Sequence, residues 1–476
     1  MSRKVCVVIT ARPSYARIKT ALRAIQEHDD LELQLVVGAS ALLERFGAPV
    51  DYIQRDGFDV AARVYMVVEG ENLVTSAKST GLGLVELATV FDNLVPDVVV
   101  TVADRYETLA TAVAAAYSNL PVAHVQGGEV TGSIDEKVRH AVTKLSDLHF
   151  VANERAADYV RRMGENPDAV FVTGGPDIDL AAEAAEAGAL DFDPFERFGG
   201  VGDRLDLSEG YAVVLQHPVT TSWADAREQV TPTLEALHGL GIATLWFWPN
   251  VDAGSDGTSK GIRVFRERSG RTNMHFFRTM PPEDFLKLVN NASVVVGNSS
   301  AAIRECSFLG IPAVDIGERQ AGRERGANVV NVPYGVGAIA EAVQAQIAHG
   351  RYPSEHVYGD GGAGPRGVIA APSGLGRPCL GEPPMFRPSR PRHIAGGCAP
   401  CRASPWPWLR AAERSPAAAY PVRRGDGIYR RVGDTFYADF GNQFDDVNLL
   451  KGTFANGEQE MSVEQLEPSA GPCNRR

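Results

Sequence analysis

The chain has 476 residues, the composition of a soluble globular protein and a formal net charge of −12 at pH 7. This length is too great for one ordinary core, so it predicts two packed domains with some remainder. The negative charge argues against non-specific binding to nucleic acid or to an anionic membrane, while leaving room for a small basic pocket for a phosphate ligand. The longest apolar runs are far shorter than the roughly 20 residues of a membrane helix, and no signal-peptide layout precedes Lys4, so we expect a cytoplasmic protein without a membrane partner.

The first 190 residues alternate β-branched runs with amphipathic stretches. Runs such as "KVCVVIT" and "DVVVTVAD" are followed by helix-like runs such as "SYARIKTALRAIQEH" and "YETLATAVAAAYSNL". Near-continuous apolar strands separated by helices are typical of a parallel sheet that is covered on both faces. We therefore predict a doubly wound, Rossmann-like α/β domain over residues 1–190.

The same alternation restarts after a polar, glycine-rich connection. The runs "YAVVLQHP", "IATLWFWPN", "SVVVGNSS" and "PAVDIG" are strand-like and are separated by helix-like segments. They predict a second Rossmann-like α/β domain over residues 205–362. Two such domains facing each other form a cleft that is lined by the carboxyl ends of their strands.

The texture changes in residues 363–476, which we predict to be an irregular, largely disordered tail. From 365 to about 425 the chain is rich in Pro, Gly, Arg and Ala and lacks helix or strand periodicity. The stretch "GIYRRVGDTFYADFGNQFDDVNLLKGTF" regains alternation and fits one or two hairpins. The lone "CAPC" pair lacks the second closely spaced pair that a zinc site usually needs, so we predict no metal.

The turn after the first strand, "ITARPSYARIK", stands where a dinucleotide-binding domain would carry GxGxxG. The missing glycines argue against NAD binding. Arg12 lies in the turn itself and is a candidate to bind a phosphate or a sugar, whereas we expect Arg17, one turn later, to be a solvated helix residue.

The stretch "VVVTVADRYETLA" ends a buried strand with Asp104 and Arg105. Charged residues at the carboxyl end of a central parallel strand lie where such sheets bind ligands. Asp104 also fits the N-cap of the following helix, and the sequence leaves both interpretations open.

A second strand end carries Ser299 and Ser300 in "VGNSSAAIRECSFLG". A helix start offers unpaired backbone N–H groups, which together with two hydroxyls would seat a diphosphate. Glu305 is a candidate acceptor for ribose hydroxyls, and Arg319 and Arg323 are candidate anion partners. A serine that only caps the helix is the simpler alternative.

Three more polar residues follow strands of the second half. His217 lies in "LQHPVTT", and Asn250 and Asp252 lie in "FWPNVDAG". Each is weak evidence by itself, because a lone histidine is most often structural and the second stretch is a turn signal.

The stretch "HVQGGEVTGSIDEKVRH" concentrates charge beside two glycines. The glycines let backbone and substrate approach closely, and Ser133 with Glu136 fits a capping box at a helix start. The residues alone leave open whether Glu129 and Asp135 serve catalysis or only the helix start.

Taken together, these stretches resemble the hydrolysing UDP-N-acetylglucosamine 2-epimerases, the family that includes sialic-acid pathway enzymes, from about residue 4 to 362. The resemblance implies a glycosyltransferase-B-like fold with two Rossmann-like domains. It also implies anti elimination of UDP from a UDP-linked N-acetyl amino sugar, through a 2-acetamidoglucal, followed by rehydration. UDP-N-acetylglucosamine would give N-acetylmannosamine and UDP, for sialic-acid-like sugar biosynthesis.

By this resemblance the catalytic residues would be Asp104, Glu129, Asp135 and His217. The substrate-binding residues would be Arg12, Arg105, Gln126, Asn250, Asp252, Ser299, Ser300, Glu305, Arg319 and Arg323. Some relatives have a glutamate at 126, and a glutamine cannot act as a base. Either Glu129 takes that task, or the base is Asp104 or Asp135.

Other interpretations remain. A UDP-N,N'-diacetylbacillosamine or GDP-linked amino sugar is an alternative substrate. A non-hydrolysing epimerase, a glycosyltransferase and a silent nucleotide-sugar binder are alternative functions, although the "HVEAGLRT" and "PEE" stretches of non-hydrolysing relatives are not seen. The reaction needs no cofactor and implies no metal, and the resemblance suggests a homodimer or homotetramer.

Overall fold

The computed structural model describes residues 2–70, 72–250, 252–270 and 272–374, and four short strands between 427 and 463. Residues 1–384 form one compact unit and residues 385–476 form another. The predicted disorder of the proline-rich segment and the tail cysteines fall outside the described residues.

The N-terminal part of the first unit is built on a parallel sheet of seven strands in the order β3-β2-β1-β4-β5-β6-β7. β1 is central, and the chain winds outward from it in both directions, which is the predicted doubly wound arrangement. The strands are β1 (Arg3–Ile9), β2 (Leu31–Gly38), β3 (Val60–Val64), β4 (Val98–Val102), β5 (Val122–Val125), β6 (Leu148–Val151) and β7 (Val170–Val172). The helices are α1 (Arg12–Ala16), α2 (Lys19–Gln26), α3 (Pro49–Arg55), α4 (Leu73–Leu94), α5 (Tyr106–Tyr117), α6 (Ile134–Lys144) and α7 (Glu154–Arg162).

Helices cover both faces of this sheet, which explains why its strands are apolar at nearly every position. In β1, the side chains of Val5 and Val7 pack in a core with Leu22 of α2. The alternate residue Cys6 packs on the opposite face with Phe91 of α4. Because successive strand residues point to opposite faces, both sets must be apolar when both faces are covered.

A second parallel sheet has six strands in the order β10-β9-β8-β11-β12-β13. Its strands are β8 (Tyr211–Leu215), β9 (Ala243–Phe247), β10 (Met274–Phe277), β11 (Val294–Gly297), β12 (Ala313–Ile316) and β13 (Val329–Val332). Its helices are α9 (Pro194–Phe198), α10 (Ala226–Leu240), α11 (Ser255–Ser269), α12 (Pro282–Asn290), α13 (Glu305–Leu309) and α14 (Val336–His349). The fold is therefore two doubly wound α/β domains, as predicted.

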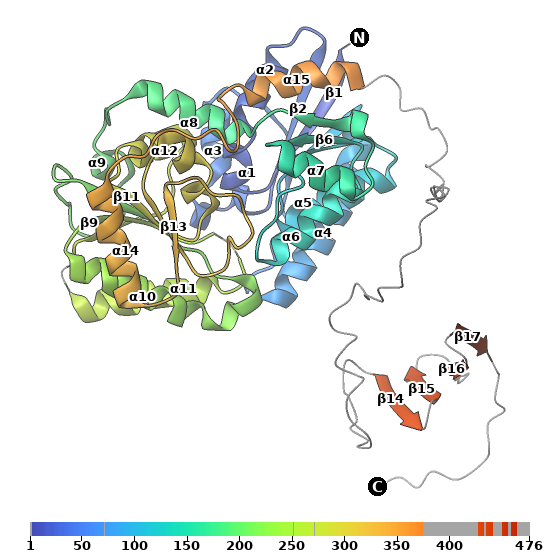
Figure 1. Ribbon diagram of the computed structural model, residues 1–476. Coiled ribbons are helices and arrows are strands. Elements are labelled where there is room, and N and C mark those ends of the chain that lie inside the picture. The colour runs from blue at the N-terminus through green and yellow to red at the C-terminus, as the bar shows by residue number, and fades with distance from the viewer. Residues whose placement is uncertain are drawn as a thin grey trace, which may run out of the picture. The chain divides into compact units, whose positions relative to one another are not determined.

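Two helices connect the domains. α8 (Pro176–Ala187) follows β7 and packs against α2 on one side and against α12 and α13 on the other. α15 (Ala363–Gly374) comes after the last strand of the second sheet and lies beside α2 and α8 (Figure 1). The chain thus returns to the N-terminal domain at its end.

The predicted tail boundary at residue 363 is corrected by α15. Asp179 of α8 accepts hydrogen bonds from the backbone N–H groups of Ala363 (2.8 Å) and Gly364 (2.7 Å), and Val368 joins the core of the N-terminal domain. The glycine and proline content hid this helix, because its start depends on a carboxylate that is distant in sequence.

The second unit contains a four-stranded antiparallel sheet in the order β14-β15-β16-β17. Its strands are β14 (Gly427–Val432), β15 (Thr435–Phe440), β16 (Leu450–Ala455) and β17 (Glu458–Val463). The predicted hairpins fall within this sheet. Among the described residues, no helix is both long and apolar enough to cross a membrane.

The role of α15 can be tested by truncation. We expect a chain that ends after residue 374 to keep the melting temperature of the full chain. A chain that ends after residue 362 should melt several degrees lower, because it exposes Val368's neighbours and leaves Asp179 buried without its backbone donors. Scanning calorimetry checks this, and equal melting temperatures for the two truncations would contradict it.

Candidate functional site

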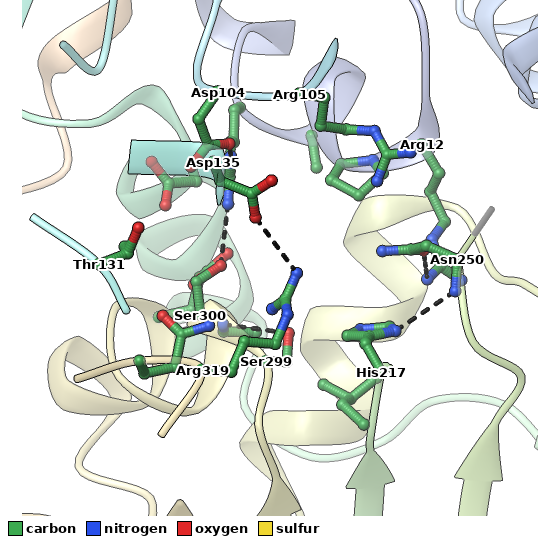
Figure 2. Close-up of a pocket in the computed structure, with 18 of the residues that line it drawn as sticks. Arg12, Asp104, Arg105, Thr131, Asp135, His217, Asn250, Ser299, Ser300 and Arg319 are labelled. Carbon is green, nitrogen blue, oxygen red and sulfur yellow. Dashed lines mark hydrogen bonds and ion pairs between the residues drawn. The ribbon is translucent and has the colours of Figure 1, made fainter. Parts of the chain in front are cut away.

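A pocket lies between the two domains, where loops from the carboxyl ends of both sheets come together. Figure 2 shows side chains from the two domains pointing into the same space. On each sheet, the strands at the switch point contribute: β1 and β4 in the N-terminal domain, and β8 and β11 in the C-terminal domain.

Asp104 lies on the N-terminal wall of the pocket. Ala103, in the left-handed region with φ of 67°, turns the chain out of β4 just before it. The N-cap of α5 is Arg105, so Asp104 does not cap that helix. Its carboxylate pairs instead with Arg139 and, at 3.6 Å, with Arg17. Burial opposes ionisation, but these arginines outweigh it and hold the pKa of Asp104 well below its ordinary range.

Asp135 lies in the first turn of α6 beside Asp104, and its carboxylate is more open to the pocket. Its closest cation is Arg319, at 3.8 Å. Burial, followed by repulsion from Asp104, raises the pKa of Asp135. Ser133 is the N-cap, as predicted, but Glu136 accepts from the backbone N–H of Thr131 (2.8 Å), so the capping box is not closed as expected.

Five arginines line the pocket around these carboxylates: Arg12, Arg17, Arg105, Arg319 and Arg323. Arg12, at the start of α1, donates to Asn250 Oδ1 at 3.2 Å. Arg105 pairs with Asp252 at 2.8 Å. Arg319 donates to the backbone oxygen of Asn298 at 3.1 Å.

Arg17, which we expected to be solvated, donates to Ser300 Oγ at 2.9 Å and so connects α1 to the other domain. The five guanidinium groups line the pocket from both domains and give it the positive charge that a diphosphate requires.

His217 follows β8 and is almost fully buried. Its backbone N–H donates to Asn298 Oδ1 at 2.7 Å, and its Nδ1 accepts from the backbone N–H of Asn250 at 3.3 Å. Burial, then Arg319, Arg12 and Arg105, lower the pKa of His217 well below its ordinary value. The neutral ring therefore carries its proton on Nε2, which makes it a hydrogen-bond donor.

Ser299 and Ser300 follow β11 and line the pocket. The expected continuous helix is instead a 3₁₀ turn at Ser300–Ala302, which Ser299 caps, followed by the short α13. Glu305, the first residue of α13, also lines the pocket, and its Oε2 is buried without a hydrogen-bond partner among the described residues. Burial and then repulsion from Asp177 raise the pKa of Glu305 to about 7.

Glu129 lies behind the pocket wall in a buried ionic cluster. One carboxylate oxygen pairs with Arg304 and the other pairs with Arg323 at 2.5 Å. Arg304 also binds Asp177 through two hydrogen bonds, of 2.7 and 2.9 Å. Burial opposes ionisation, but Arg304 and Arg323 outweigh it and lower the pKa of Glu129 to about 2.

Gln126 also lies behind the wall. It is 2% exposed, its backbone is left-handed with φ of 65°, and its Nε2 donates to Asp177 Oδ1 at 2.6 Å. Gly128 does not face the pocket either, since a Cβ there would lie 2.2 Å from the backbone oxygen of Ala156. A Cβ at Gly127 would lie 2.9 Å from His124 Nδ1, so both glycines serve close packing within the chain, and not the substrate approach that we predicted.

Apolar residues also line the pocket. They come mainly from the C-terminal domain, with two residues of the first helix region, and they are Pro13, Ala16, Leu215, Met280, Pro282, Phe285, Leu286 and Ala301. A pocket whose lining is partly cationic, partly acidic and partly apolar suits a ligand with three chemically different parts.

The chain belongs to the UDP-N-acetylglucosamine 2-epimerase family, which it matches over residues 23–370. It is 28% identical over 361 residues to the UDP-N-acetylglucosamine 2-epimerase of Neisseria meningitidis serogroup B, covering 76% of this chain and 92% of that protein. It is 29% identical over 361 residues to the UDP-N,N'-diacetylbacillosamine 2-epimerase (hydrolyzing) of Legionella pneumophila, covering 76% and 93%.

Solved structures show the same fold. A UDP-GlcNAc 2-epimerase from Neisseria meningitidis bound to UDP-GlcNAc superposes with a TM-score of 0.64 at 18% identity, covering 78% of this chain and all of that one. A complex of the Methanocaldococcus jannaschii enzyme with UDP-GlcNAc and UDP gives 0.63 at 18% identity, covering 78% and 99%.

The structure brings most of the predicted site residues to one pocket: Arg12, Asp104, Arg105, Asp135, His217, Asn250, Ser299, Ser300, Glu305, Arg319 and Arg323. It does not bring Glu129, Gln126 or Asp252 to the pocket wall, because each is turned toward a buried or neighbouring charged partner.

Sequence reasoning missed several residues that shape the pocket. Asp177 and Arg17 line it, and Arg139 and Arg304 hold its carboxylates. Arg139 and Arg304 lie within the quoted motifs, so arginines near strand ends in the sequence could have indicated them. No sequence signal marked the apolar lining residues, since they fit ordinary core positions.

Replacing Glu129 tests the buried cluster. The pKa of Glu129 is lower in the folded chain than in the unfolded chain. The ionised carboxylate therefore stabilises the fold at pH values above the unfolded pKa, and this stabilisation is lost as the pH falls through the folded pKa. We expect Glu129→Gln to lower the free energy of unfolding at pH 7 by about 3 kcal/mol. The difference in the free energy of unfolding between the wild type and Glu129→Gln should become smaller as the pH falls from 5 to 3.

Urea denaturation across this range measures the effect. Glu154→Gln is the matched control, because the Glu154 carboxylate pairs with Arg161 on the surface and its loss should cost at most about 1 kcal/mol. A constant difference between wild type and Glu129→Gln at all pH values would contradict the assignment.

Proposed function

We propose that this protein is a hydrolysing 2-epimerase of a UDP-linked N-acetyl amino sugar, most simply one that converts UDP-N-acetylglucosamine to N-acetylmannosamine and UDP. The observation that carries the proposal is the presence, in one pocket, of two unlike carboxylates, a group of arginines and a set of apolar side chains. The names of relatives support it, since that of the Legionella protein specifies hydrolysis.

The substrate fits this pocket in one direction. The uracil base would lie against the apolar side chains, with the unpartnered oxygen of Glu305 placed to accept from ribose hydroxyls. The diphosphate would bind among Arg12, Arg105 and Arg319 and the two serine hydroxyls. The amino sugar would then lie against Asp104 and Asp135. No metal is required, because the arginines balance the negative charge of the departing UDP.

The two carboxylates suit different tasks. Asp104 stays ionised and weakly basic because arginines hold it, so it stabilises the positive charge that develops on the sugar ring. Asp135, whose pKa is raised, is the stronger base and takes the proton from C2. Gln126 and Glu129 bind other partners, so they support the pocket and do not act on the substrate.

The bonds then balance as follows. The C2–H electron pair forms the C1–C2 double bond, and the C1–O pair leaves with the β-phosphate of UDP. His217, a neutral Nε2–H donor, stabilises the departing oxygen. Water adds its hydroxyl to C1 of the 2-acetamidoglucal, and C2 regains a proton on the opposite face, so that the free sugar is inverted at C2.

Product analysis tests the proposal. We expect the full chain with UDP-N-acetylglucosamine to release UDP and free N-acetylmannosamine in equal amounts, as followed by NMR. UDP-N,N'-diacetylbacillosamine and a GDP-linked amino sugar should be run in parallel, because relatives with those names are similar to this chain. An epimer that keeps its UDP would show a non-hydrolysing enzyme, and no turnover without an acceptor would favour a glycosyltransferase. A cytoplasmic location and a homodimeric or homotetrameric state remain predictions.

Removing either carboxylate charge should disable the reaction. We expect Asp104→Asn and Asp135→Asn each to lower turnover by at least about a hundredfold, the loss typical of an acid/base or charge-stabilising group. Steady-state release of UDP measures this, and Asp29→Asn, at an exposed position, is the control. Near-normal turnover in either variant would remove that residue from the catalytic set.

A further inference from the structure

Asn298 is the first residue after β11, which lies beside β8 in the second sheet. Gly297 is paired with Leu215 in the parallel register, and the backbone N–H of Asn298 still donates to the Leu215 oxygen at 3.0 Å. Gly297 has a φ of 134°, and a Cβ there would lie 2.2 Å from the same oxygen. The chain therefore turns at this glycine, and the regular backbone pairing of the two strands stops.

The side chain of Asn298 continues the pairing where the backbone does not. Its Oδ1 accepts from the backbone N–H of His217 at 2.7 Å, and its Nδ2 donates to the backbone oxygen of His217 at 2.8 Å. Among the described residues, the His217 backbone has no other hydrogen-bond partner. Asn298 is 1% exposed and His217 is 5% exposed, so water does not replace these bonds. One side-chain amide thus takes the place of a peptide group beside His217.

The backbone oxygen of Asn298 binds a second residue of the pocket. Arg319 donates to this oxygen at 3.1 Å, and Gln320 donates to it at 2.9 Å. Asn298 itself does not line the pocket, whereas His217, Arg319 and Gln320 all do. Asn298 can therefore act on a bound ligand only through these neighbours, with its side chain holding His217 and its main chain holding Arg319.

The ring of His217 has one hydrogen bond of its own. Its Nδ1 accepts from the backbone N–H of Asn250 at 3.3 Å, and its Nε2 has no partner among the described residues. Figure 2 shows this bond and the ring at the pocket. A bond of 3.3 Å is long and weak, so it does not orient the ring alone. The direction of the Nε2–H group then depends on the backbone that carries the ring.

We propose that Asn298 is a positioning residue for the departure of UDP, because its side-chain amide fixes the His217 backbone so that the Nε2–H group points at the departing oxygen. This role rests on the proposed function, which identifies that oxygen, whereas the amide contact belongs to the fold. A shift of about 1 Å in a catalytic group can cost on the order of a hundredfold in rate. Loss of the amide should therefore lower turnover more than nucleotide binding, since Arg319 keeps its backbone acceptor.

Alanine variants of two buried asparagines test the proposal. Asn298→Ala should lower kcat for UDP release at least about tenfold and change the Kd of UDP less than about threefold. Asn328→Ala is the matched control, because Asn328 is 2% exposed, lies outside the pocket lining and also binds two partners through its amide, the Ile311 oxygen and Ser307 Oγ, both at 2.8 Å. It should lower the melting temperature and leave kcat unchanged. An Asn298→Ala chain with wild-type kcat would overturn the proposal.

Asn298→Asp gives a test in which the pH restores the contact. A protonated carboxyl has the shape of the amide and offers the same donor and acceptor, whereas an ionised one turns a negative oxygen toward the His217 backbone oxygen. The kcat of Asn298→Asp, divided by that of the wild type, should therefore rise as the pH falls from 8.5 to 5.5. A ratio that stays constant over this range would contradict the role of the amide.

NMR of the chain with ¹⁵N-labelled histidine provides a readout that needs no turnover. We expect the His217 signals, assigned by their loss in His217→Gln, to show the neutral Nε2–H form in the wild type and a mixture of both neutral forms in Asn298→Ala. If the alanine variant does not fold, Asn298→Asp at pH 8.5 takes its place. Unchanged His217 signals would overturn the inference, whereas a wild type without turnover would refute only the proposed function.

Discussion

Two arginines of the C-terminal domain, Arg304 and Arg323, meet on one buried carboxylate of the N-terminal domain, Glu129. Removing charges from water is costly, and a buried ion pair compensates only when each group keeps its partners. Each domain alone would therefore bury an unpaired charge or leave it in water. The packing of the domains therefore depends on Glu129 keeping both arginine partners.

The same cluster extends to the pocket carboxylates. Arg139 donates to the backbone oxygen of Glu129 at 2.6 Å and pairs with Asp104. Asp104 is thus held by an arginine that also binds the residue at the domain contact. Asp135 has a single, longer ion pair, with Arg319 of the C-terminal domain at 3.8 Å, and the pKa values of the two aspartates move in opposite directions from similar starting points. One pocket therefore places a carboxylate with a lowered pKa beside one with a raised pKa.

The sequence predicted the features that lie at or directly after strand ends. Apolar runs and the polar residues directly after them located both sheets and most of the pocket, because the carboxyl ends of parallel strands converge. The sequence could not predict the direction in which a side chain points. Gln126 and Glu129 follow β5 as expected, yet they bind Asp177, Arg304 and Arg323, residues brought close only by the tertiary fold.

The end of the chain was harder to predict for the same reason. α15 carries little helical signal of its own, and the carboxylate that starts it belongs to α8, some 184 residues earlier. Local pattern cannot show a helix that begins on a distant acceptor. The broken helix after Ser299 was missed because a 3₁₀ turn and an α-helical start look alike in sequence.

The return of the chain through α15 also limits how the domains can move. The polypeptide passes from the N-terminal to the C-terminal domain near α8 and comes back just before α15, so two covalent connections join the domains. Bodies tied at two nearby points turn most easily about the line through them. Ligand exchange is then expected to involve rotation of one domain relative to the other about these two connections, beside which Asp177 of α8 pairs with the buried Arg304.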